Sequence, residues 1–271
     1  MNVLWVFAHP EQRSLSGSLR DEGVRALAEA GHACRLSDLY AMGWKATVDR
    51  GDFGGGPEDG GGGEDGGECV PDERLVVTST SRRAHRDGTL SPDIRAEQEK
   101  LARADTVVLQ FPLWWYGMPA ILKGWFDRVF VKGFAYGVTD PERPGRTLRY
   151  GQGLLAGKRA LVVVTAGSPE PALGPRGING QLDHVLFPLL HGTLWYTGMT
   201  VLPPVAVYGA DRLTPRQYEE AAALLRDRVL TAEDTEPLPF RFQNGGDYDD
   251  DLVLRPELAP GATGLGVHYA L

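Results

Sequence analysis

Three short stretches of this sequence carry side chains that could bind a ligand rather than build a core. Residues 8–17 offer histidine, arginine and serine, residues 111–118 hold three adjacent aromatic residues, and residues 165–179 are rich in glycine and proline. Continuous apolar runs, typical of buried parallel strands, precede all three stretches. These runs are 2–7, 106–111 and 160–165. Because the carboxyl ends of parallel strands meet at one edge of a sheet, the three loops should converge there.

The first stretch could bind a phosphate group. It places His9, Ser14 and Ser16 just before an expected helix start at Ser18, where Ser18 and Asp21 form an S-x-x-D capping pair. Free backbone N–H groups, hydroxyl donors and the positive end of a helix dipole suit an anion. The glycine patterns of Rossmann dinucleotide-binding domains and of P-loops are absent from the sequence. The alternative is that these serines only cap the helix.

The second stretch could form one wall of a site for a flat ring. Residues 112–119 read PLWWYGMP, with three consecutive aromatic residues between two prolines. Three neighbours cannot all face one core, so at least one should face solvent or a ligand. Packing in the core or at a dimer interface is the alternative.

The third stretch opens with small residues, Thr165, Ala166, Gly167 and Ser168. Small residues at a strand end let a flat ligand approach the backbone closely. Together the three stretches describe a phosphate pocket, an aromatic wall and a floor of small residues. A flavin is the cofactor that needs all three, and a flavodoxin-like sheet is its natural host.

The rest of the sequence alternates strand and helix patterns. Weaker strands are expected at 33–37 and 200–207, the second at an edge because Pro203 and Pro204 cannot occupy a central strand. Helices are expected near 18–30, 91–104, 119–130, 180–197 and 214–230. This alternation predicts an α/β fold: a flavodoxin-like, doubly wound parallel sheet with helices on both faces.

Composition and charge exclude several other classes. The chain has 271 residues and a net charge of −8, but residues 51–68 hold six acids and no base, so the remainder carries only −2. A nearly neutral surface argues against a nucleic-acid partner. The two cysteines cannot form a disulfide scaffold, and the histidine spacing predicts no metal site. No apolar run reaches the ~18 residues of a membrane span and no signal peptide is visible, so we expect a cytoplasmic protein.

We expect two parts along the chain. Residues 1–235 should form the flavin-binding domain, interrupted by a flexible insertion at 51–75 that is rich in glycine and acid. Residues 236–271 show no clear periodicity and should form an irregular C-terminal extension that packs on the domain or on a dimer partner.

The chain resembles the NAD(P)H:quinone oxidoreductases of the DT-diaphorase family, particularly their bacterial members. The most specific match is QFPLWWYGMPAILKGWFDRVFVKGFAYG at 110–137, and GINGQLDHVLFPLLHGTLWYTG at 177–198 continues it in register. LSPDIRAEQEKL at 90–101, TEPLPF at 235–240 and GLGVHY at 264–269 also match. The resemblance covers nearly the whole chain outside 51–75 and 139–149.

This resemblance implies a homodimer that holds FAD, with the active site at the dimer interface. Reduced nicotinamide would deliver a hydride to flavin N5 and leave, and a quinone or related aromatic acceptor would then take the hydride at the same site. The reaction would therefore be a ping-pong, two-electron transfer.

The resemblance also assigns residues by position. The phosphate and ribityl groups would contact His9, Ser14, Leu15 and Ser16; in the family an aromatic residue and Asn stand where Leu15 and Ser16 stand here. The isoalloxazine would contact Pro112, Leu113, Trp114, Trp115 and Tyr116, and its polar edge Thr165, Ala166, Gly167 and Ser168. The adenosine half would lie near Asp127 and Arg228. The substrate pocket would be lined by Trp115, Tyr116, Leu173 and Asn179, and covered by Tyr136 and Tyr196 of the partner subunit. The residues expected to act in catalysis are Asn179, Tyr136 and Gly167.

One departure from the family concerns the third loop. The better-known family members carry a Tyr and a His there, which would stabilise and protonate the reduced flavin, whereas this chain has Leu173 and Asn179 in register. Leucine can do no proton chemistry, and an Asn amide can donate a hydrogen bond but cannot relay a proton. Our hypothesis is that Asn179 and backbone donors stabilise the flavin charge by electrostatics alone.

Two other functions remain open from the sequence. One is a flavodoxin-like ancillary subunit that regulates a potassium efflux system, for which the acidic insertion is the only candidate docking surface. The other is an azo- or nitroreductase that uses FMN, against which Asp127 and Arg228 argue.

Overall fold

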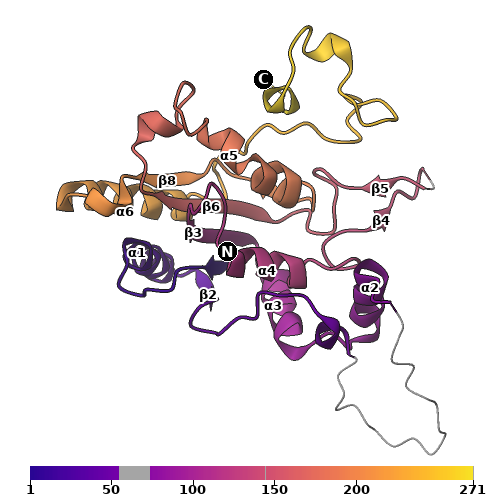
Figure 1. Cartoon of the computed structure of the whole chain (residues 1–271), viewed down its shortest axis with the longest axis horizontal. Helices are drawn as coiled ribbons and strands as arrows, with labels where there is room; N and C mark the ends of the chain where they lie inside the picture. Colours follow the sequence, from indigo (N-terminus) through magenta and orange to yellow (C-terminus); the bar gives the residue numbers. More distant parts are fainter. Residues whose placement is uncertain (55–73, 144, 271) are drawn as a thin grey trace, which may run out of the picture.

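One parallel sheet organises the chain, whose computed structural model describes residues 1–54, 74–143 and 145–270 (Figure 1). The strand order is β2-β1-β3-β6, and β7 and β8 both pair with the free side of β6. The strands are β1 Asn2–Phe7, β2 Ala33–Asp38, β3 Thr106–Pro112, β6 Arg159–Ala166, β7 Thr200–Val201 and β8 Val205–Tyr208. This order confirms the predicted α/β, flavodoxin-like class.

Helices cover both faces because the strand residues alternate between two cores. Val3, Trp5 and Phe7 of β1 face the core that α1 and α6 close, whereas Leu4 and Val6 face the core closed by α3, α4 and α5. The helices are α1 Leu15–Glu29, α3 Pro92–Arg103, α4 Ala120–Val129, α5 Leu182–Leu189 and α6 Pro215–Leu230. The π-helical turn η3, Leu190–Trp195, continues α5.

The start predicted for the first helix was wrong. Helix α1 begins at Leu15 rather than near Ser18, because the Ser14 side chain is the N-cap and accepts a hydrogen bond from the Gly17 N–H at 3.1 Å. Ser18 lies inside the helix, where its N–H donates to the Ser14 carbonyl. The earlier start places the first helical turn at the end of β1, directly in the first candidate loop.

The expected edge strand 200–207 is divided by its prolines. Pro203 and Pro204 separate β7 from β8, and both short strands pair only with β6 among the described residues. The expected helix near 180–197 likewise changes from α-helical to π-helical geometry at Leu190. The predicted starts of α3, α4 and α6, after Ser91, Pro119 and Thr214, are confirmed.

The insertion predicted as flexible over 51–75 is ordered at its start. Arg50–Phe53 forms the 3₁₀ turn η1, in which Asp52 and Phe53 are buried. The segment 55–73 lies outside the described residues. Helix α2, Val77–Asp87, follows and was not predicted, since it buries only Ser81 and Ala84 and so lacks an apolar stripe.

The C-terminal extension packs beside α5 and a two-stranded hairpin (Figure 1). The hairpin consists of β4 Val138–Thr139 and β5 Thr147–Leu148, within the segment that departs from the family pattern. The extension contains two 3₁₀ turns, η5 Pro256–Leu258 and η6 Leu265–His268, and is anchored by the buried ring of Phe240. Across the described ranges, no helix combines the length and apolar character that crossing a membrane requires.

A buried ion pair fastens the η1 turn to the core. The Arg128 and Asp52 side chains are 2% and 1% exposed, and Arg128 donates from Nε at 3.2 Å and Nη2 at 2.8 Å to one Asp52 oxygen. The Arg128 guanidinium also donates to Asp93 at 2.7 Å and lies 4.5 Å from the centre of the Trp44 indole. Removing one partner of such a pair leaves a buried charge without full compensation.

We therefore expect Asp52→Ala to lower the free energy of unfolding by about 3 kcal/mol, measured by urea denaturation. The matched control is Asp127→Ala, which breaks the Lys123–Asp127 pair on an exposed helix face and should cause no measurable change. Equal stability of the two variants would contradict a structural role for the buried pair.

Candidate active site

The first loop presents two free donors at the start of α1. The N–H groups of Leu15 and Ser16 donate no hydrogen bond within the described part of the chain. A Cβ at Gly17 would lie 2.0 Å from the Gln12 carbonyl oxygen, so glycine is required for the loop to fold back over the helix. Two N–H groups at a helix N-terminus form an anion site.

The second loop is a tight turn under backbone strain. The Trp114 N–H donates to the Gly117 carbonyl at 3.1 Å and the Gly117 N–H returns a bond at 3.0 Å. The two residues between them, Trp115 and Tyr116, have φ angles of 49° and 60°. Such turns usually contain Asn-Gly, and bulky residues in this region cost of order 1–3 kcal/mol each.

The strained turn displays its aromatic side chains. Trp115 is 97% exposed, and Trp114 and Tyr116 are 43% and 54% exposed. Ile178 on the third loop is 96% exposed and was missed by the sequence analysis. Exposed large apolar side chains grouped on adjoining loops indicate a surface that a ligand or a partner covers.

Direct contacts bring the three loops together, as the sequence predicts. The His9 and Trp114 rings lie 6.1 Å apart, and the buried hydroxyls of Ser16 and Thr165 share a hydrogen bond at 2.9 Å. The Leu113 N–H donates to the Thr165 carbonyl at 2.8 Å.

Asn179 bridges the second and third loops. Its Oδ1 accepts from the Tyr116 hydroxyl at 3.0 Å, and its Nδ2 donates to Ser168 Oγ at 2.9 Å. One amide proton remains available to a ligand. The Asn179 amide therefore lies beside the exposed aromatic turn, as its expected role in stabilising the flavin charge requires.

Arg228 and Leu173 lie on one side of the third loop, whereas Asp127 makes no hydrogen bond or ion pair with any of the three loops among the described residues. Arg228 donates to the carbonyl of Pro203 and shares a cavity with Leu173, Gly174 and Pro175 of the third loop. Asp127 lies in the last turn of α4 and pairs with Lys123. Leu173 is 3% exposed and packs into the core. The assignment of Asp127 and Arg228 to the adenosine half, and of Leu173 to the substrate pocket, stays a prediction.

Tyr136 and Tyr196 form a separate pair. Their ring centres are 6.5 Å apart, and Tyr196 also meets Tyr150 edge-on at 5.2 Å. Burial raises the pKa of the Tyr136 hydroxyl, which keeps it neutral at physiological pH. Among the described residues, neither tyrosine makes a ring contact or a hydrogen bond with the three loops of its own chain.

Gln110 is a second residue that the sequence analysis missed. It is fully buried in β3, where its Oε1 accepts from the Trp5 indole at 2.9 Å and its Nε2 donates to the Ser16 carbonyl at 2.7 Å. A glutamine inside the apolar run 106–111 was the available signal. Gln110 positions the first turn of α1 against the sheet.

Comparison with known proteins gives consistent results. Residues 1–229 match the family described by its flavodoxin-like fold. A ribosyldihydronicotinamide dehydrogenase-like protein from Penicillium crustosum is 42% identical over 270 residues, which cover 99% of this chain and 95% of that protein. NAD(P)H dehydrogenase (quinone) 1 from Rattus norvegicus is 35% identical over 238 residues, covering 88% and 80%. The crystal structure of a proposed quinone reductase from Klebsiella pneumoniae is 49% identical, covers both chains fully and superposes with a TM-score of 0.90.

The strain in the aromatic turn can be measured through two substitutions at one position. Trp115→Gly and Trp115→Ala both remove the exposed ring, but only glycine adopts the positive φ without strain. The glycine variant should be more stable than the alanine variant by about 0.5–1 kcal/mol in denaturation of the flavin-free protein. An alanine variant of equal or greater stability would show that the turn stores no strain at this residue.

Proposed function

We propose a function from the premise that this chain belongs to the flavodoxin-like family and, within it, to the NAD(P)H:quinone oxidoreductases. The protein is a flavin-dependent NAD(P)H dehydrogenase that reduces a quinone or a related aromatic acceptor by two-electron transfer. One observation supports this proposal most strongly. The free N–H groups at the start of α1, the strained aromatic turn and the polar third loop all lie at one edge of the sheet.

The residues present fit a flavin. The N–H groups of Leu15 and Ser16 would hold a phosphate, and the turn at Trp114–Tyr116 would lie against the ring system. The backbone of Gly167 and the Asn179 amide would face the polar edge of the ring. When bound, a flavin supplies the carrier that accepts a hydride from the nicotinamide and passes it to the acceptor.

FAD is the cofactor that we propose, and FMN is the alternative. Asp127 and Arg228 make no hydrogen bond or ion pair with the first loop among the described residues, so their contacts do not decide for FAD. The proposal of FAD therefore depends on the family pattern of His9 and Ser14 in that loop. The mass of the released cofactor decides between the two.

The proposed homodimer would complete the site. Trp115 and Ile178 are almost fully exposed in the single chain, and Tyr136 and Tyr196 lie away from the loops of their own chain. A partner subunit that supplied these tyrosines would cover the apolar side chains and exclude water from the reacting atoms. The cytoplasmic location stays a prediction, and the acidic segment needed by the regulatory-subunit alternative lies mostly outside the described residues.

The reaction class is tested by the absorbance spectrum of the purified protein. We expect a flavin spectrum that bleaches when NADPH is added without oxygen and recovers when a quinone follows. Heat release and mass determination should identify FAD. A protein that takes up neither FAD nor FMN on reconstitution would contradict the proposed function and favour the regulatory alternative.

The role of Asn179 is tested by stopped-flow flavin reduction. Asn179→Leu should slow reduction by NADPH about tenfold, less than the ~10²-fold or larger loss typical of an oxyanion donor, since hydride transfer develops less localised charge. The control Tyr116→Phe keeps the amide and removes only the hydroxyl that orients it, so its effect should be smaller. Reduction of Asn179→Leu at the wild-type rate would refute an electrostatic role.

A further inference from the structure

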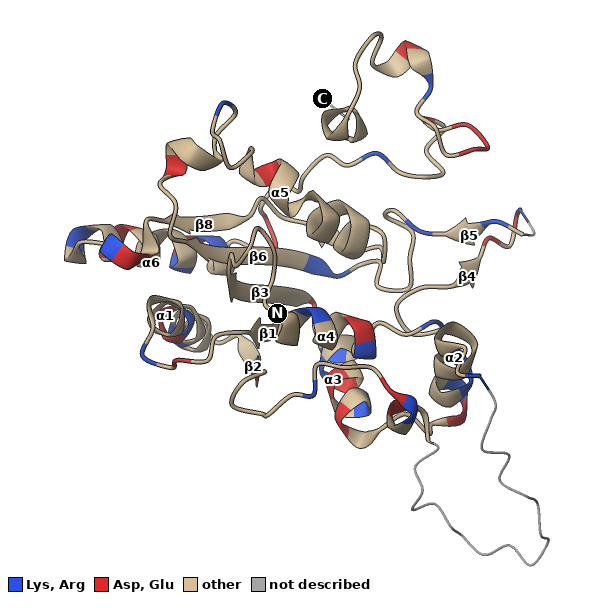
Figure 2. Cartoon of the chain, viewed as in Figure 1, with Lys and Arg blue, Asp and Glu red and all other residues tan. Residues whose placement is uncertain are grey.

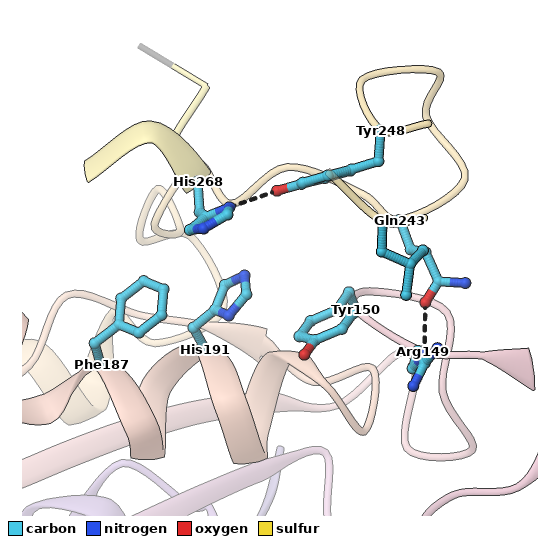
Figure 3. A pocket seen from close by; sticks show the side chains of 8 residues that line it. Arg149, Tyr150, Phe187, His191, Gln243, Tyr248 and His268 are labelled. Carbon is cyan, nitrogen blue, oxygen red and sulfur yellow. Dashed lines mark hydrogen bonds between the residues drawn. The ribbon is translucent and has the colours of Figure 1, made fainter. Parts of the chain in front are cut away.

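A cleft lies between the core and the C-terminal extension, at a distance in sequence from the three loops. It has a volume of about 270 Å³. One wall comes from α5, η3 and the segment after β5, and the other from the extension (Figure 3). Its lining residues are Arg149, Tyr150, Phe187, His191, Gln243, Tyr248, Leu252 and His268.

The walls of the cleft are stacks of flat rings. Phe187 and His191 stack at 4.6 Å with planes 16° apart, and His191 and Tyr150 stack at 4.8 Å with planes 29° apart. Across the cleft, the Tyr248 and His268 rings are 19° from parallel and joined by a hydrogen bond of 2.9 Å (Figure 3). The walls meet at one end, where the His191 and His268 ring centres are 5.5 Å apart, so the faces open to a flat aromatic ligand are those of Tyr150 and Tyr248.

Arg149 is the only charged residue among the eight that line the cleft. Its Nε donates to Gln243 Oε1 at 2.9 Å, which fixes the guanidinium and leaves its terminal nitrogens free of any acid in the described part of the chain. In the extension, Asp247 already pairs with Arg241 at 2.6 Å. The β5 segment that carries Arg149 is basic (Figure 2). A fixed guanidinium without an acid partner is suited to a carboxylate ligand.

Burial lowers the pKa of both histidines of the cleft, because it disfavours their charged form. Burial, with the neighbouring His268, lowers the pKa of His191 to about 4, so its ring is neutral at pH 7. The buried Nε2 of His191 has no hydrogen-bond partner among the described residues. An unpaired buried polar atom is costly, and a polar group on a ligand would satisfy it.

The backbone of this cleft, like that of the aromatic turn, contains residues with strained, positive φ angles. Four described residues other than glycine have positive φ; two are Trp115 and Tyr116, and the other two, Tyr150 at 50° and Leu252 at 64°, line the cleft. Strain of this kind persists where the surrounding structure holds it, characteristically at ligand-binding surfaces.

We propose that this cleft is a binding site for a flat aromatic carboxylate, whose ring lies against Tyr150 and Tyr248 and whose carboxylate pairs with Arg149. The cleft adjoins the Tyr136–Tyr196 pair through Tyr150, whose ring meets Tyr196 at 5.2 Å. The site is defined by one chain and does not require that the protein bind flavin.

The test is isothermal titration calorimetry of the full-length protein, as purified and again after saturation with FAD. The probes are 2-naphthoate and its neutral isostere 2-naphthamide. We expect 2-naphthoate to bind one site per chain at least about tenfold more tightly, in both preparations, because a charge-assisted bond to guanidinium is lost in the amide. Equal affinities, or no binding of 2-naphthoate, would overturn the proposal.

Three variants locate the binding. Arg149→Gln should abolish the preference for the carboxylate, whereas Arg143→Gln, on the same hairpin but outside the cleft lining, should retain it. Tyr248→Leu should lower the affinity for both probes and leave the ratio of the two affinities unchanged. This result would distinguish the loss of an aromatic contact from the loss of the charge. Thermal melts of each variant establish that the fold is intact. An undiminished preference in folded Arg149→Gln would place the binding elsewhere and contradict the assignment.

Discussion

The geometry of the candidate active site depends on the buried amide of Gln110. Within the central strand β3 this amide accepts the Trp5 N–H and donates to the carbonyl of Ser16, so that β1, β3 and the first turn of α1 are held by one side chain. A buried amide left without partners would be costly, so the helix start cannot drift from its place over the sheet. The Ser16–Thr165 bond extends the same constraint to β6. The free N–H groups of Leu15 and Ser16 consequently point to a fixed position beside the second and third loops.

This fixed frame explains how two strained surfaces can persist. Each residue forced into the left-handed region works against folding, and such residues survive only where their surroundings determine the backbone. Trp115 and Tyr116 are held by a doubly hydrogen-bonded turn and by the link to Asn179, whereas Tyr150 is held by stacking on His191 and edge contact with Tyr196. Strain is thus concentrated at the two surfaces where we propose ligands, and the apolar strands around them adopt ordinary geometry.

The sequence was sufficient for the sheet and for the meeting of the three loops, because unbroken apolar runs such as 160–165 that alternate with helix patterns are typical of strands buried in a parallel sheet. It was insufficient where a distant partner decides the structure. Asp52 looks like part of an acidic insertion, and only its pairing with Arg128 shows that it is buried.

The cap of the first helix is a further example. Ser14 and Ser18 could each cap it, and Ser14 does so because Gly17 lets the loop fold back over the helix start. The sequence did not show where Arg228 lies, because its place beside Pro203 depends on the direction in which α6 packs along the sheet. Arg149 carried no signal, since its cleft is built from segments almost a hundred residues apart.

The most direct test of this account is a crystal structure of the protein with its flavin bound. The account predicts the phosphate at the N–H groups of Leu15 and Ser16, the ring system against the turn at Trp114–Tyr116, and the polar edge facing Asn179 and Gly167. A flavin bound at any other edge of the sheet, or with its phosphate away from the start of α1, would contradict the central claim that the three loops form one cofactor site.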